Sequence, residues 1–382
     1  MLLKSRKGLF QAKQYNKKAK EFWKQKHDEL TNEIIDVLNS STDLQLLKIS
    51  QELVKKTNLT DLSCSISEII ELRKILKIFS IETVVSEFVN YCARTGFLTV
   101  VIAPAIAAAE GIGSIKEEVM NEWIYGIGVC LPLSADIGDC IIDKEVYKHP
   151  LIPLNAWLTC HKLGSAIIFK IGIDHTKSIK TGDKNLDKYI ITRLEKGIKK
   201  VSEKQIMDFK AKEIPNLPES KLEEIYDGKI CEIEATVFGT IPSTKKNIIK
   251  IFEEGARYFA GELQVVDDME DLLGDSNLEK RPEIPNPSFF LSYCFDFWKE
   301  GKRDLKKIIE DALEKTLKKG QEYHENVAKQ FEKLPKNFPT KPFFQITLWY
   351  YNKLLMQRYN QVLKGKTYPV IRPLLLNKLK ES

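Results

Sequence analysis

Apolar residues along most of this chain recur three and four positions apart, with Lys and Glu between them. Strict alternation of apolar and polar residues, the pattern of a half-buried strand, is rare. The spacing therefore predicts an all-α protein. The helical pattern is interrupted by short clusters of Pro, Gly and Asn, which are typical of loops between packed helices. These clusters read HPLIPLNA, KTGDKN, EIPNLPES, TIPSTKK, EKRPEIPNPS and LPKNFPTKP.

The pattern divides the chain into a long central region and two shorter ends. Residues 1–45 are rich in Lys with a few aromatic residues, which predicts an N-terminal amphipathic helical extension packed on the main body. Residues 46–364 form one predicted helical domain, because none of the breaks is long enough for a free linker. Residues 365–382 form a short basic tail.

The longest uncharged stretch begins at Gly96, contains Pro104 and stops at Glu110. It is shorter than the ~20 apolar residues that a membrane-spanning helix needs. We therefore expect a buried core helix and no transmembrane segment. The chain begins MLLKSRKGLF, which carries charge at once and lacks the apolar run of a secretion signal, so the expected location is the cytoplasm.

Composition excludes some classes of function. The 382 residues are 43% hydrophobic, which is ample for a large core. The net charge of +6 is spread along the chain, so no nucleic-acid partner is expected. Seven cysteines occur singly with no Cys-x-x-Cys pair, which indicates neither a zinc site nor a disulfide framework and suits reduced thiols in the cytoplasm.

One segment, ADIGDCIIDKE, places three carboxylates on the same side of a predicted helix. Asp136, Asp139 and Asp143 lie at positions i, i+3 and i+7. The residues between them include Ile137, and the helix is expected to be largely buried because most of these neighbours are apolar.

A second segment, FAGELQVVDDMEDLLGD, repeats this spacing with Asp268, Asp271 and Asp275. Asp267 precedes Asp271 by one turn, and Gln264 precedes Asp268 by one turn. Val, Met and Leu fill the positions around them. The two segments therefore predict two carboxylate-bearing helices in apolar surroundings.

Such rows of carboxylates need a cation. Carboxylates ~6 Å apart repel by roughly 3 kcal/mol per pair at an effective dielectric constant of about 20. Lysines on a solvated helix face would be the simplest source of positive charge, but the apolar neighbours argue against solvated faces. Carboxylate oxygens suit Mg²⁺, which commonly bridges one or two carboxylates to a substrate phosphate.

The second segment resembles the signature of the isoprenoid synthase superfamily, that is, the trans-isoprenyl diphosphate synthases (the polyprenyl synthetase family) and the related terpene cyclases. From Phe259 to Asp275 it reads Phe, Gln, then Asp-Asp-x-x-Asp-x-x-Gly-Asp. The first segment falls where the family has another Asp-Asp-x-x-Asp motif, with Cys140 in place of the second Asp. The resemblance covers residues 91–359 and implies the isoprenoid synthase fold, a helical bundle around a central apolar cavity.

The resemblance also implies roles for individual residues, with more than one Mg²⁺ ion as cofactor and a prenyl diphosphate as substrate. The implied metal ligands are Asp139, Asp143, Asp267, Asp268 and Asp271, with Asp136 compensating for Cys140. The implied substrate-binding residues are Gln264, Lys280, Asp275, Lys229 and Arg94. The candidates for lining the cavity are Phe238, Phe259, Ser134 and Ala135. Relatives are commonly homodimers, which we carry over as an expectation.

Three functions remain open. Chain elongation needs isopentenyl diphosphate, which the elongating enzymes hold with basic residues, and a diphosphate binds tightly only through several charge-assisted hydrogen bonds. At the corresponding positions ARTGFLT retains only Arg94, and EVYKHP replaces an expected Arg-Arg-Gly. This favours a terpene cyclase or another non-elongating enzyme. Prenyl elongation is the alternative, since Lys148 and Lys229 could replace some of the missing charge, and a non-catalytic subunit of a heteromeric prenyl synthase is the second.

The length of the substrate is suggested by small residues before the first motif. In elongating relatives, bulky residues four and five positions before that motif block the pocket, and here those positions are Ala135 and Ser134. The resemblance therefore favours a prenyl chain of C15 to C20 or longer.

Overall fold

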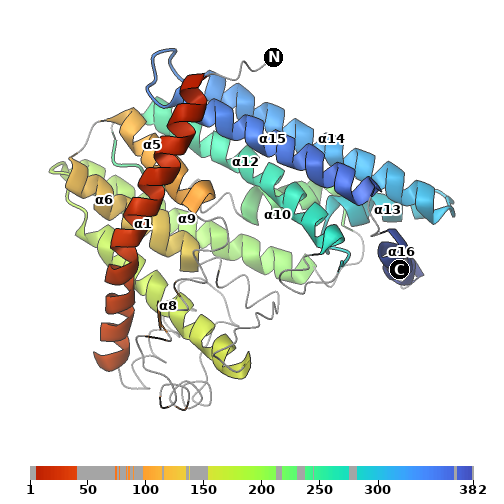
Figure 1. The fold of residues 1–382 in the computed structure, drawn as a ribbon, viewed down its shortest axis with the longest axis horizontal. Coiled ribbons are helices and arrows are strands. Elements are labelled where there is room, and N and C mark those ends of the chain that lie inside the picture. The colour runs from red at the N-terminus through yellow and green to blue at the C-terminus, as the bar shows by residue number, and fades with distance from the viewer. Residues whose placement is uncertain are drawn as a thin grey trace.

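The computed structural model describes residues 6–40, 98–113, 116–134, 154–211, 217–229, 237–243, 245–274, 282–364 and 368–380, and a few isolated positions between 74 and 137. Within these ranges every regular element is a helix (Figure 1). The predicted all-α fold is therefore confirmed for the part of the chain that is described.

The helices fall into two groups in chain order. The first group is α1 (Arg6–Ser40), a π-helical turn η1 (Leu98–Ile102) that continues into α5 (Ala103–Ile112), α6 (Glu117–Tyr125) with a second π-helical turn η2 (Gly126–Cys130), α8 (Leu154–Ser178) and α9 (Lys184–Ala211). The second group is α10 (Glu219–Lys229), α12 (Lys246–Leu273), α13 (Phe289–Lys299), α14 (Leu305–Glu332), α15 (Lys341–Lys364) and α16 (Tyr368–Lys380).

Three long helices, α12, α14 and α15, pack side by side across the upper part of Figure 1. Small residues allow close contact between them. A Cβ atom added at Gly261 of α12 would lie 2.6 Å from the Tyr323 ring of α14, and one added at Gly320 of α14 would lie 3.1 Å from Val265 of α12. These close approaches fix the position of α12, which carries the second carboxylate segment.

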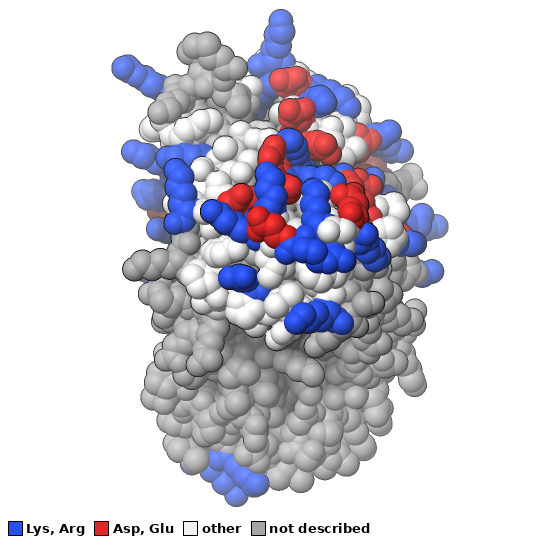
Figure 2. All heavy atoms as spheres, turned by 90° about the vertical axis from the view of Figure 1, so that its right-hand side faces the viewer, with Lys and Arg blue, Asp and Glu red and all other residues white. Residues whose placement is uncertain are grey.

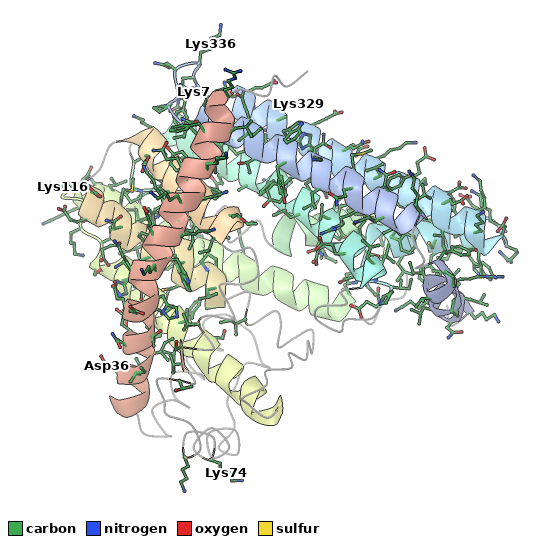
Figure 3. The ribbon with its side chains drawn as sticks, in the orientation of Figure 1. Lys7, Asp36, Lys74, Lys116, Lys329 and Lys336 are labelled. Atoms are coloured by element: carbon green, nitrogen blue, oxygen red, sulfur yellow. The ribbon has the colours of Figure 1, made fainter. Side chains whose placement is uncertain are left out.

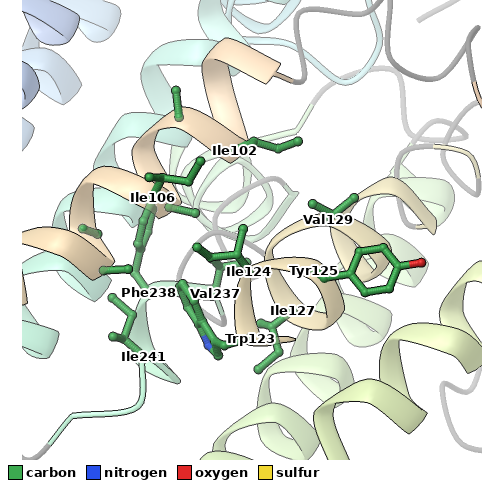
Figure 4. Close-up of a cluster of buried hydrophobic side chains, with 14 of the residues drawn as sticks. Ile102, Ile106, Trp123, Ile124, Tyr125, Ile127, Val129, Val237, Phe238 and Ile241 are labelled. Atoms are coloured by element: carbon green, nitrogen blue, oxygen red, sulfur yellow. The ribbon is translucent and has the colours of Figure 1, made fainter. Parts of the chain in front are cut away.

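A buried apolar cluster joins the helices of the first group to the segment before α12 (Figure 4). Trp123 and Ile124 of α6 lie beside Ile106 of α5, Phe238 and Ile241 in this cluster. Every residue of α5 except Glu110 is buried, so the buried core helix expected for the uncharged stretch is confirmed over its described part. In the ranges that the structure describes, no helix is both long and apolar enough to cross a membrane.

Helix α1 packs on the main body, as expected of an amphipathic N-terminal helix. Its first half contacts α15, where the Tyr15 and Phe343 rings meet edge to face with centroids 5.0 Å apart. Its second half contacts α8 through Glu33, which lies 2.8 Å from His175 Nε2. The division of the chain at residues 45 and 364 stays a prediction.

The contact between α1 and α8 leads to a testable pH dependence. His175 also hydrogen-bonds Glu122 of α6, with 2.7 Å between Nδ1 and the carboxylate. The hydrogen bond to Glu33 is the largest of the effects that raise the pKa of His175 from 6.5 to about 9. A histidine whose pKa is raised by folding stabilises the fold below its unfolded pKa, and this contribution is lost as the pH rises through the folded pKa.

We expect the wild-type protein to lose about 1–2 kcal/mol of its free energy of unfolding between pH ~6.5 and ~9 through this group, after allowance for solvent screening. The measurement is urea denaturation at several pH values for the wild type and for His175→Asn. The difference in stability between the two proteins should shrink as the pH rises. A difference that stays constant across this range would mean that the charge of His175 does not stabilise the contact.

Candidate active site

The second carboxylate segment lies at the end of α12, whose last two turns carry Asp267, Asp268 and Asp271. Val265, Met269 and Leu272 are buried and anchor this end of the helix in the apolar core that it shares with α13 and α14. The helix ends at Gly274, whose φ of 67° is a left-handed conformation that favours glycine. The Gly274 amide donates to the Glu270 carbonyl over 2.9 Å and closes the last turn. The carboxylates therefore lie on a regular helix with a defined end.

Asp268 is buried and hydrogen-bonded, with only 2% of its surface exposed. The Tyr226 hydroxyl of α10 donates to Asp268 Oδ2, and Gln264 Nε2 donates to Asp268 Oδ1 over 3.2 Å. The Tyr226 hydroxyl also accepts from the Phe289 amide, the first residue of α13, over 3.3 Å. This hydrogen-bond network connects α10, α12 and α13 at the carboxylate segment.

The surroundings of Asp268 affect its protonation. Burial raises the pKa of the Asp268 carboxyl well above its usual range, while the hydrogen bond from Tyr226 lowers it. The neighbouring Asp267 carboxylate raises the pKa of Asp268 further. Burial likewise raises the pKa of the Tyr226 hydroxyl, which keeps it a hydrogen-bond donor.

Asp267 and Asp271 lie one turn apart on α12, and Asp271 is also one turn from the buried Asp268. Asp267 is exposed and Asp271 is half-buried. Asp271 follows Glu253 by eighteen residues, which is five helical turns, so the two share one side of the helix. Glu253 pairs with Arg193 of α9. Near Asp267 the Gln264 amide nitrogen lies 3.5 Å from Asp267 Oδ2.

Contacts on the other side of the motif hold the segment in place. Arg358 Nε of α15 donates to Glu270 Oε1 over 2.7 Å. The Glu283 amide donates to the Asp271 carbonyl over 3.0 Å, which brings the following segment back to the end of α12. Glu270 thus attaches α12 to α15.

The candidates for lining a cavity fall in different surroundings. Phe259 is half-buried on α12, and its ring meets Tyr351 of α15 edge to face with centroids 4.8 Å apart. Phe238 lies in the buried cluster of Figure 4 and stacks on Phe252, with centroids 5.7 Å apart. Ser134 is also buried, and its hydroxyl donates to the Leu131 carbonyl over 2.8 Å. Phe238 belongs to a buried apolar cluster against which Phe259 also packs, and the assignment of these side chains to a cavity stays a prediction.

Several residues expected from the sequence lie outside the described part of the chain. These are Asp136, Asp139, Asp143, Asp275, Lys280, Arg94 and Ala135, together with the side chain of Lys229. The relation between the two carboxylate segments therefore stays a prediction. What the structure adds is the arrangement of Gln264, Asp267, Asp268 and Asp271.

Sequence reasoning missed two residues that shape this site. Tyr226 is on α10, 42 positions from Asp268, and no motif marks it. Arg358 is on α15, 88 positions from Glu270, in a stretch predicted only as part of the helical domain. Both are polar side chains opposite the carboxylate segment, and only the packing of the helices reveals these pairs.

Comparisons with known proteins support the fold. A scan against protein-family models and a search of curated proteins find no match. Solved structures do match. A decaprenyl diphosphate synthase from Rhodobacter capsulatus has a TM-score of 0.56 at 13% identity, over 82% of this chain and 99% of that one.

Two further solved structures match over a similar share of the chain. A geranylgeranyl pyrophosphate synthetase from the archaeon Geoglobus acetivorans has a TM-score of 0.57 at 16% identity, over 80% of this chain and 99% of that one. A polyprenyl synthase from Caulobacter crescentus, complexed with calcium and isoprenyl diphosphate, has a TM-score of 0.55 at 13% identity, over 82% and 98%. The protein therefore has the isoprenoid synthase fold, which it shares with prenyl diphosphate synthases.

Proposed function

We propose that this protein is a Mg²⁺-dependent isoprenoid synthase that ionises an allylic prenyl diphosphate. The observation that carries the proposal is the pair Asp267 and Asp271, one turn apart on α12 beside Asp268, which accepts a hydrogen bond from Tyr226. The isoprenoid synthase fold and the calcium and isoprenyl diphosphate in the solved Caulobacter structure support the same chemistry. The preferred substrate is a C15 to C20 or longer prenyl chain.

The donor set fits Mg²⁺. Asp267 and Asp271 offer hard carboxylate oxygens one helical turn apart, and a site of this kind is normally completed by water and substrate phosphate. By resemblance, Asp139 and Asp143 would contribute from the other carboxylate segment. When bound, the metal supplies positive charge that neutralises the diphosphate and stabilises it as a leaving group.

The residues of this chain have separate tasks in the proposed reaction. Asp267 and Asp271 would bind the metal, and the Gln264 side-chain amide provides a hydrogen-bond donor next to them. Asp268, fixed by Tyr226, keeps the last turns of α12 in register. The allylic C–O bond breaks, the bonding electrons leave with the diphosphate, and an allylic carbocation remains. Aromatic ring faces such as that of Phe259 can stabilise such a cation.

The fate of the carbocation separates the candidate reactions. The scarcity of basic residues at the expected isopentenyl diphosphate positions favours internal quenching, as in a terpene cyclase, or transfer to an acceptor without a diphosphate. Prenyl elongation is the second candidate, because the matching structures include a decaprenyl diphosphate synthase and a geranylgeranyl pyrophosphate synthetase. A non-catalytic subunit is the third and least favoured reading, since the second carboxylate motif is complete.

The test is incubation of the purified full-length chain with farnesyl or geranylgeranyl diphosphate and Mg²⁺, with and without isopentenyl diphosphate. We expect pyrophosphate together with a hydrocarbon or alcohol in the absence of isopentenyl diphosphate. A longer prenyl diphosphate, formed only when isopentenyl diphosphate is present, would establish elongation instead. No pyrophosphate under either condition would contradict the proposed chemistry and favour the non-catalytic subunit.

A further inference from the structure

The beginning of α1 exposes two adjacent large apolar side chains. Leu9 is 43% exposed and Phe10 is 68% exposed. Among the residues that the structure describes, no other large apolar side chain is as exposed as Phe10. Removing these two side chains from water would be favourable.

Positive charge surrounds this apolar pair. The first twenty residues contain no Asp or Glu, and the first acidic residue is Glu21. The basic residues in this stretch are Lys4, Arg6, Lys7, Lys13, Lys17, Lys18 and Lys20. Lys17 lies 3.6 Å from Glu21 and Lys18 lies 2.5 Å from Glu110, so these two charges are compensated. Arg6, Lys7 and Lys13 are exposed, and none of them has an ion pair with a described residue.

A pocket of about 240 Å³ lies beside the start of α1. Its basic residues are Lys7, Lys336 and Lys341, and the amides of Asn337 and Gln345 line it as well. Lys341 Nζ donates to the Glu332 and Leu334 carbonyls over 2.9 and 2.6 Å, which holds this ammonium in place. Lys7 and Lys336 have no acidic partner in the described part of the chain, and both lie at the end of the molecule where α1 begins (Figure 3).

The apolar pair and the pocket lie together because of how α1 packs. Gln11 Nε2 donates to the Pro339 carbonyl over 2.9 Å, and a Cβ atom at Gly8 would lie 2.6 Å from the Pro342 carbonyl. These contacts place one side of α1 against the loop that follows α14 and against the first turn of α15. Lys7 and Phe10 are three residues apart, so their side chains are neighbours on the surface of the helix. The exposed ring thus lies next to a basic pocket.

At the end of the molecule where α14 begins, basic side chains are paired with acidic ones. Figure 2 faces that end and shows Lys and Arg interspersed with Asp and Glu. There the charges are compensated on α14, for example by Lys307 and Asp311 at 2.8 Å and by Lys318 and Glu314 at 2.9 Å. The start of α1 differs from this face of α14 because its exposed Arg6, Lys7 and Lys13 have no ion pair with a described residue.

We propose that the start of α1 docks on an anionic membrane surface. Phe10 and Leu9 enter the boundary between headgroups and acyl chains, and the pocket of Lys7, Lys336 and Lys341 takes a lipid phosphate. Basic helices with exposed apolar residues bind anionic lipid in this way. A second copy of the chain is a poor occupant, because a symmetric contact would bring two basic surfaces together. A nucleic acid would satisfy the lysines but would leave Leu9 without a function.

The test is co-sedimentation of the full-length protein with vesicles of phosphatidylcholine alone or of phosphatidylcholine with about one third phosphatidylglycerol. We expect the anionic vesicles to bind at least about tenfold more tightly, since each lysine near such a surface is worth about fivefold in partitioning. Lys7→Gln with Lys336→Gln should weaken this binding by roughly twentyfold, following the same fivefold per lysine. Phe10→Asn should weaken binding to anionic vesicles as well.

The matched control is Val370→Asn on α16, because Val370 is 44% exposed but lies outside this surface. It should bind vesicles like the wild type. Absence of vesicle binding, equal binding to neutral and anionic vesicles, or an equal loss with Val370→Asn would overturn the proposal. So would complete displacement by inorganic phosphate or by a short RNA at matched ionic strength. The assay contains no prenyl substrate, so its failure is distinguishable from failure of the proposed reaction.

Discussion

Asp267→Asn and Asp271→Asn are each expected to slow Mg²⁺-dependent pyrophosphate release by about a hundredfold to a thousandfold, the usual effect of removing one group that stabilises charge in a transition state. Each substitution removes one carboxylate from the side of α12 that we assign to the metal. The protein should remain folded, because Asp267 is exposed and Asp271 is only half-buried. The measurement is the initial rate of pyrophosphate release from the preferred prenyl diphosphate at saturating Mg²⁺.

Two variants within the same motif serve as controls. Glu270→Gln removes a charge of the same sign, but Glu270 contacts Arg358 on the α15 side, so the rate should change little. Asp268→Asn should lose less activity than Asp267→Asn, because an amide oxygen can still accept the hydrogen bond from Tyr226. Equal losses for Glu270→Gln and Asp267→Asn would show that the rate follows the total charge of the helix and not the two assigned positions.

His324→Leu is expected to lower the free energy of unfolding by about 3 kcal/mol, the typical effect of removing one partner from a buried polar pair. Glu262 of α12 is fully buried, and His324 Nδ1 of α14 lies 3.1 Å from both of its oxygens. Burial raises the pKa of Glu262, and the hydrogen bond from His324 counteracts that rise. Chemical denaturation measures the loss.

The double variant Glu262→Leu with His324→Leu separates the pair from its packing. Replacing both polar groups by apolar side chains removes the unpaired buried carboxyl, so the double variant should be more stable than His324→Leu alone. If His324→Leu changes the stability by less than about 1 kcal/mol, or if the double variant is the less stable of the two, this pair does not support the packing of α12 on α14.

Much of the fold could be predicted from the sequence because the information is local. The spacing of apolar residues that fixes α12 is present in the residues of α12 itself, and the i, i+3 and i+4 relations among Gln264, Asp267, Asp268 and Asp271 follow directly from helical geometry. The buried stretch that became α5 was recognisable from its uninterrupted apolar composition. Resemblance then connected these elements to the isoprenoid synthase fold, which the solved structures confirm.

The rest depends on contacts between distant parts of the chain. The sequence gives Asp267, Asp268 and Asp271 the same chemistry, and only packing shows that Asp268 is turned toward Tyr226. The stacking of Phe238 on Phe252 likewise joins residues of separate segments, which no local pattern shows.

The C-terminal tail gives a similar lesson. Its basic residues were easily recognised, but the sequence alone did not show that Tyr368–Lys380 is the helix α16, with Ile371, Leu375 and Leu379 buried against the main body. Apolar residues four positions apart carry this information, and the density of Lys obscured it.

The most direct test of the account is the binding of Mn²⁺, a spectroscopic substitute for Mg²⁺, in the presence of a non-reactive thiolo-diphosphate analogue of geranylgeranyl diphosphate. Electron paramagnetic resonance of the wild type should show Mn²⁺ bound tightly only when the analogue is present, and the double variant with Asp267→Asn and Asp271→Asn should lose this binding while retaining its fold. Analogue-dependent Mn²⁺ binding that persists undiminished in the double variant would contradict the assignment of these two carboxylates to the metal.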